Sequence, residues 1–79
     1  MTATNKNDIF LHAMVRGILT NRITPMLCVN RILDLKLNAD EEKEMFSAFD
    51  SLLRVKNVTM ANLVKRAYEE AVNRKEQLS

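Results

Sequence analysis

Residues 33–46 read LDLKLNADEEKEMF, and the first five of them decide between two folds. Apolar and polar residues alternate from Leu33 to Leu37, which is typical of a β-strand with one buried face. The same residues also continue an apolar arc at helical spacing that begins at Met26. A strand here predicts a mixed fold, whereas a helix end predicts a plain helical bundle.

The residues on both sides of this stretch favour the helix. Thr24 followed by Pro25 is a helix start, because a hydroxyl can cap the first turn and proline is tolerated at the first helical position. Downstream, Asn38 with Glu41 three residues later approximates a capping box. We therefore predict that one helix runs from this proline to about Leu37 and that the next helix begins near Asn38.

Two further helices are expected at the ends of the chain. The fourth is predicted to begin at a Thr59 cap, with Val58 and Leu63 at the two positions of a hydrophobic staple. The first starts near Asp8, and its apolar residues cover well over half of a helical wheel. They are Phe10, Leu11, Met14, Val15, Gly17, Ile18 and Leu19.

Length and composition predict one all-α domain. Seventy-nine residues make one domain at most, and a single glycine and a single proline leave little room for a turn-rich β fold. We expect a small bundle of about four short helices. Residues 1–7 are predicted to form a flexible N-terminal arm, and residues 8–79 a single helical domain.

The surplus of apolar surface predicts a partner. A bundle of four short helices cannot cover such wide apolar arcs internally, so we expect a homodimer or a contact with another protein. Gly17 suits the close approach of another helix, although packing inside the monomer explains it equally well. The candidate partner-binding residues are Phe10, Met14, Arg16, Gly17, Ile18 and Arg22.

Catalysis is not expected. The only histidine, His12, and the only cysteine, Cys28, lie on different predicted helices, so no catalytic, cofactor-binding or metal-binding residues are assigned. One cysteine suits a reducing compartment, and no signal peptide is apparent, which predicts a cytoplasmic protein. The apolar run after Asp8 is too short to span a bilayer, so membrane insertion is not expected.

From Leu33 onward the chain resembles the ribbon-helix-helix family of dimeric DNA-binding proteins. LDLKL corresponds to the ribbon, NADEEKEMFSAFDSLL to its first helix, and NVTMANLVKRAYEEA to its turn and second helix. The resemblance implies a strand at residues 33–37, a dimer, and DNA as the partner. A net charge of only +2 is not the concentrated basic footprint typical of nucleic-acid binding, so nucleic acid is not the favoured partner.

The function that we expect from the sequence is therefore a small non-catalytic regulator or adaptor. It would act by protein–protein interaction through apolar helix faces, as a bacterial or phage inhibitor or modulator does. A dimeric transcriptional regulator of the ribbon-helix-helix type is the alternative.

Overall fold

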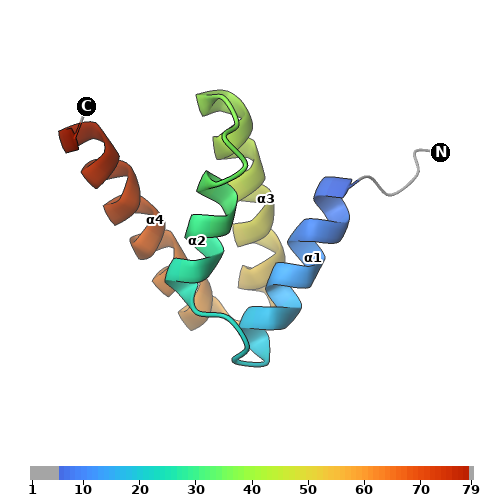
Figure 1. The fold of residues 1–79 in the computed structure, drawn as a ribbon. Coiled ribbons are helices and arrows are strands. Elements are labelled where there is room, and N and C mark those ends of the chain that lie inside the picture. The colour runs from blue at the N-terminus through green and yellow to red at the C-terminus, as the bar shows by residue number, and fades with distance from the viewer. Residues whose placement is uncertain (1–5, 79) are drawn as a thin grey trace.

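Residues 6–78 form four helices, which alternate in direction (Figure 1). The structure is a computed structural model that describes residues 6–78, with side chains described for residues 8–74. The helices are α1 (Lys6–Leu19), α2 (Pro25–Leu33), α3 (Ala39–Lys56) and α4 (Val58–Leu78). The all-α prediction is confirmed for this part of the chain.

The ribbon predicted by the alternative reading is wrong. Within residues 6–78 there is no strand, and residues 33–37 contain the last residue of α2 and the turn that follows it. The expected start of the helix is confirmed, because Thr24 Oγ1 accepts a hydrogen bond of 3.1 Å from the Leu27 N–H and Pro25 is the first helical residue.

The helix nevertheless ends at Leu33, four residues before the expected Leu37. Lys36 adopts a positive φ of 55°, which no helix can continue through. The resulting turn keeps Leu33 and Leu37 packed against the core while Leu35 is exposed. The alternation in LDLKL therefore reflects a turn with two inward leucines, and it is neither a strand nor the last turn of a helix.

The cap of α3 follows the sequence prediction. Asn38 Oδ1 accepts a hydrogen bond of 2.8 Å from the Glu41 N–H. Asp40, Glu41 and Glu42 lie in the first turn, where the helix dipole favours negative charge.

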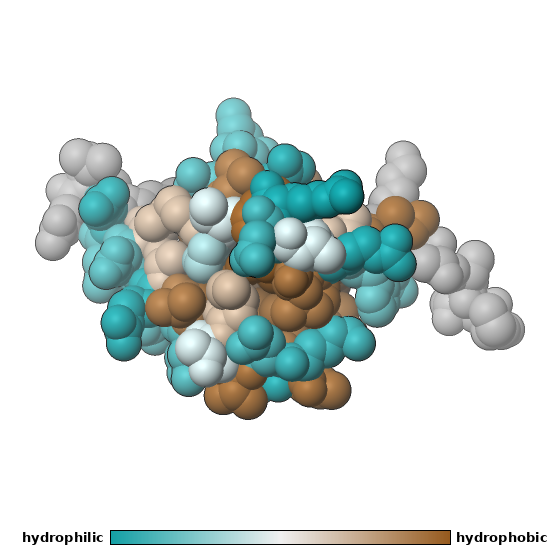
Figure 2. Space-filling view, turned by 90° about the horizontal axis from the view of Figure 1, so that it is seen from below, coloured by the Kyte–Doolittle hydropathy of each residue, from teal (hydrophilic) through white to brown (hydrophobic). Residues whose placement is uncertain are grey.

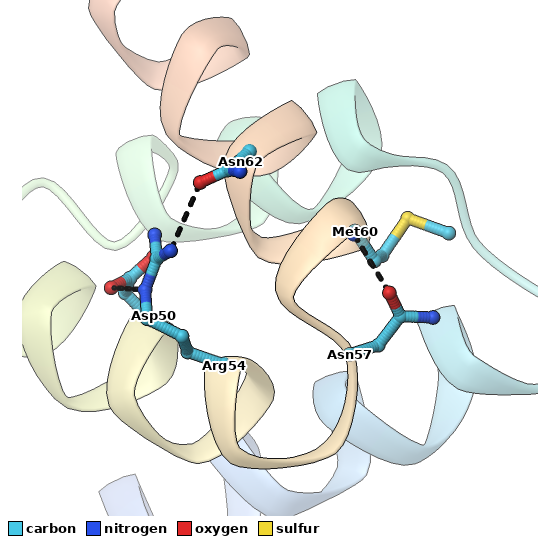
Figure 3. Close-up of polar contacts among 5 residues, drawn as sticks. All are labelled: Asp50, Arg54, Asn57, Met60 and Asn62. Atoms are coloured by element: carbon cyan, nitrogen blue, oxygen red, sulfur yellow. Dashed lines mark hydrogen bonds and ion pairs between the residues drawn. The ribbon is translucent and has the colours of Figure 1, made fainter.

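The predicted start of the fourth helix is wrong by two residues. Asn57, and not Thr59, caps α4: its Oδ1 accepts a hydrogen bond of 3.0 Å from the Met60 N–H (Figure 3). The same residue ends α3, because its N–H donates to the Leu53 carbonyl over 2.8 Å. One asparagine thus joins two helices, and the expected staple residues Val58 and Leu63 are both exposed.

We expect Asn57→Ala to lower the free energy of unfolding by about 0.5–2 kcal/mol, since the substitution leaves the first turn of α4 without its side-chain acceptor. Thr59→Ala is the matched control and should change it by less than about 0.5 kcal/mol. Urea denaturation of both variants measures this difference. A larger effect at Thr59 than at Asn57 would contradict the assignment of the cap.

Three interactions among the described residues join α3 to α4 beyond the apolar core. Arg54 binds Asp50 through two hydrogen bonds and reaches Asn62 on α4 over 2.9 Å (Figure 3). Nearer the other end of α3, the rings of Phe46 and Tyr68 are stacked with centroids 4.1 Å apart, and the Tyr68 hydroxyl donates to a Glu42 carboxylate oxygen. Burial, together with this hydrogen bond, raises the pKa of Tyr68 to about 12.

The central pair of helices is α2 and α3, each of which packs against all three others. Over the described residues no Cα atom of α1 lies within 8 Å of a Cα atom of α4, and Figure 1 shows the two helices at opposite sides of the molecule. The first helix is therefore covered by its neighbours on one side only. This arrangement exposes the opposite side of α1.

Candidate protein-binding surface

Most of the apolar residues of α1 lie on its covered side, where they are buried or packed against the core. Leu11, Met14, Val15 and Ile18 are all buried in the core of the single chain. On the exposed side, Ile9, Ala13 and Gly17 follow one another at intervals of four residues, and Ile9 is 61% exposed. The apolar residues available to a partner are thus a different set from the ones that the helical wheel emphasised.

Two adjoining surface hollows lie along this exposed side. Together we call them the α1 groove. Ala13, Gly17 and Arg22 line both hollows. The first hollow is completed by Ile9, His12, Arg16 and Thr20, and the second by Phe10, Met14, Ile23 and Arg31. The groove is therefore built from α1, the link that follows it, and one residue of α2.

The link between α1 and α2 shapes one end of the groove. The Gly17 carbonyl accepts hydrogen bonds from the N–H groups of Arg22, at 2.8 Å, and Ile23, at 3.3 Å. Asn21 has a φ of 62°, a left-handed conformation that asparagine tolerates better than most residues. These contacts fold the link back onto α1 and set Arg22 beside the helix.

The same fold accounts for Gly17. A Cβ atom at this position would lie 3.1 Å from two carbon atoms of the Ile23 side chain. The sequence left two explanations for this glycine, which are packing inside the monomer and the close approach of another helix. The position of Ile23 supports packing inside the monomer.

Positive charge surrounds the apolar floor of the groove. Arg16, Arg22 and Arg31 are all exposed, and His12 lies one helical turn before Arg16. Among the described residues that line the two hollows, none is acidic. The acidic residue of α1, Asp8, instead lines a separate hollow with Glu41 and Glu44 of α3. The groove thus presents at least three positive charges to a ligand.

The six residues predicted to bind a partner divide into three groups. Phe10, Arg16, Gly17 and Arg22 line the groove. Met14 contributes to its base but is only 3% exposed, and Ile18, at 1%, lies inside the core.

Several residues that line the groove are not among the six predicted from the sequence. The interval of four residues from Ile9 to Ala13 to Gly17 is visible in the sequence and could have indicated this row. Arg31 could not be found in that way, because it belongs to α2 and only the tertiary fold brings it to the groove.

Cys28 and His12, the cysteine and the histidine of the chain, lie on different helices and differ in exposure to solvent. Cys28 is fully buried in α2, and burial raises the pKa of its thiol to about 11, with Arg31 lowering it in part. Such a thiol stays protonated and is a poor nucleophile at neutral pH. His12 is exposed on α1. Among the described residues, no group of three or more His, Cys, Asp or Glu side chains is placed to hold a metal ion.

A second apolar surface lies at the end of the molecule where α3 meets α4. Val55 is 87% exposed and Val58 also reaches the surface. Figure 2 views this end and shows hydrophobic side chains scattered between hydrophilic ones. Polar side chains therefore interrupt the apolar surface at this end.

No protein-family model, curated protein or solved structure matches this chain. In the part of the chain that the structure describes, none of the helices combines the length and the apolar character that a membrane span requires.

Proposed function

We propose that this protein is a small non-catalytic regulator or adaptor that binds another protein through the α1 groove. The supporting observation is an apolar row, including the exposed Ile9, on a helix that the rest of the fold covers on one side only. Grooves of this kind take up the apolar face of an amphipathic helix. The proposal keeps the mode of action expected from the sequence and moves it from the buried residues of α1 to its exposed side.

The ribbon-helix-helix alternative is not carried further, because its defining strand is replaced by a turn at residues 33–37. The predicted homodimer stays a prediction. Its test is the molar mass in solution, measured by light scattering over a range of protein concentrations.

Panning an unbiased library of helical peptides tests the proposed function. We expect selected peptides to shift the backbone amide NMR signals of Ala13, Gly17 and Arg22 in the ¹⁵N-labelled protein. Ala13→Trp should abolish this binding, because a large ring would fill the floor of the groove. The matched control, Ala48→Trp, places the same ring on an exposed position of α3 and should leave binding unchanged.

Peptides that map elsewhere on the protein and survive Ala13→Trp would overturn the proposed function. A library that yields no binder at all would overturn it as well. Both variants must retain the helical circular dichroism of the original chain, which separates a blocked groove from a damaged fold.

A further inference from the structure

We infer that the partner seated in the α1 groove is an acidic amphipathic helix of a different protein. This inference rests on the proposed function and adds the chemical class of the partner. It follows from three properties of the groove, which are the sign of its charge, the shape of its floor, and its lack of self-complementarity.

The first property is charge. Arg16, Arg22 and Arg31 reach the two hollows from three successive parts of the chain, and no acidic residue among the described lining residues neutralises them. A third hollow, which shares His12 and Arg16 with the groove, is lined in addition by the cationic side chain of Lys56. Arginine pairs with carboxylates through two parallel hydrogen bonds, so side chains of Asp or Glu are the natural complement.

The second property is the shape of the floor. Ile9, Ala13 and Gly17 form a row along α1 that spans about 12 Å at a helical rise of about 1.5 Å per residue. The small side chain of Ala13 lets a second helix approach closely, whereas the space beside Gly17 is filled by the Ile23 side chain, which forms part of the floor. A helix of about three turns therefore covers the row, with its apolar face inward and its acidic residues against the arginines.

The third property argues against a second copy of this chain in the same groove. A twofold contact sets each surface against itself, so the two arginine rims would face each other. Like charges held face to face oppose association. A different protein that carries the opposite charge is therefore the better occupant.

Nucleic acid fits this surface less well. Phosphate binding needs cations spaced along a backbone, and base binding needs exposed aromatic rings. The floor of the groove instead offers aliphatic side chains and a backbone glycine, and Phe10, the phenylalanine among its described lining residues, is only partly exposed. An acidic helix uses both the apolar floor and the cationic rim.

Two matched fluorescein-labelled peptides test the inference. Each has about four helical turns and one leucine face; the first carries glutamate and the second lysine on the flanks of that face. Fluorescence anisotropy should show that the glutamate peptide binds at least about tenfold more tightly, with an affinity that falls as salt is added. The double variant Arg16→Glu, Arg22→Glu should reverse the preference in favour of the lysine peptide.

The matched control is Lys65→Glu, Arg66→Glu, which makes the same change in net charge on the exposed face of α4. We expect it to keep the original preference, because neither Lys65 nor Arg66 lines the α1 groove. A reversal in this control as well would show that net charge alone governs binding and would overturn the inference.

Other results of these experiments would indicate a different occupant of the groove. Equal binding of both peptides in the groove would overturn the acidic class while leaving the proposed function intact. Failure of the glutamate peptide where library-selected peptides still bind would do the same. Displacement of the glutamate peptide by duplex DNA would replace the inference with nucleic-acid binding. A homodimer that Ala13→Trp disrupts would replace it with self-association.

Discussion

Replacing Ile18 by glutamate is expected to unfold the domain. Ile18 is 1% exposed and lies in the common core, so the substitution places a carboxylate where no described polar group can bind it. Burying an unpaired charge costs several kcal/mol, and a chain of 79 residues has a total stability of about 4–12 kcal/mol. We expect loss of most helical circular dichroism and collapse of the NMR signal dispersion at 25 °C.

Two controls make this result specific. Ile9→Glu introduces the same charge on the exposed side of the same helix and should leave the fold intact. Ile18→Val removes one methylene and should cost only about 0.5–1.5 kcal/mol. An Ile18→Glu variant that remains folded would show that this residue belongs to a surface, as the sequence analysis predicted, and would contradict the packing of α1.

Replacing Phe49 by alanine is expected to lower the free energy of unfolding by about 3–5 kcal/mol. Phe49 is fully buried on α3, one of the two helices that pack against all three others, and it is among the largest fully buried side chains. Its removal leaves a cavity that the neighbouring helices can close only in part. Urea denaturation followed by circular dichroism measures the loss.

The control for this substitution is Val55→Ala, which truncates a residue of the same helix that is 87% exposed and should shift stability by less than about 0.5 kcal/mol. Phe49→Leu should fall between the two, since it retains most of the buried volume. Similar losses for Phe49→Ala and Val55→Ala would contradict the central position of α3 in the core.

The homodimer and the regulator expected from the sequence both came from the wide apolar arcs of the predicted helices, of which the arc of the first helix is the widest. The fold bears differently on the homodimer and on the binding of another protein. Leu11, Met14, Val15 and Ile18 satisfy the arc inside the monomer, so they create no demand for a second copy. The remaining exposed row is rimmed by arginines, and such a rim favours a partner of opposite charge over an identical one.

Local signals in the sequence determined where α2 and α3 begin, because their caps depend only on residues within one turn. Thr24 with Pro25, and Asn38 with Glu41, act as the pattern predicts. The start of α4 was misplaced because Asn57 and Thr59 are both good caps, and the choice depends on where α3 ends.

Tertiary structure alone decided the rest. A helical wheel places Ile18 in the apolar arc of the first helix and Ile9 on the opposite side, in agreement with the burial of the first and the exposure of the second. It does not say whether that arc is covered by neighbouring helices of the same chain or by a partner, and only the packing of α1 on α2 and α3 decides this. The same holds for Arg31, which reaches the groove from another helix. In LDLKL, finally, the alternation places all three leucines on one face. The turn between α2 and α3 instead directs Leu33 and Leu37 to the core and leaves Leu35 exposed.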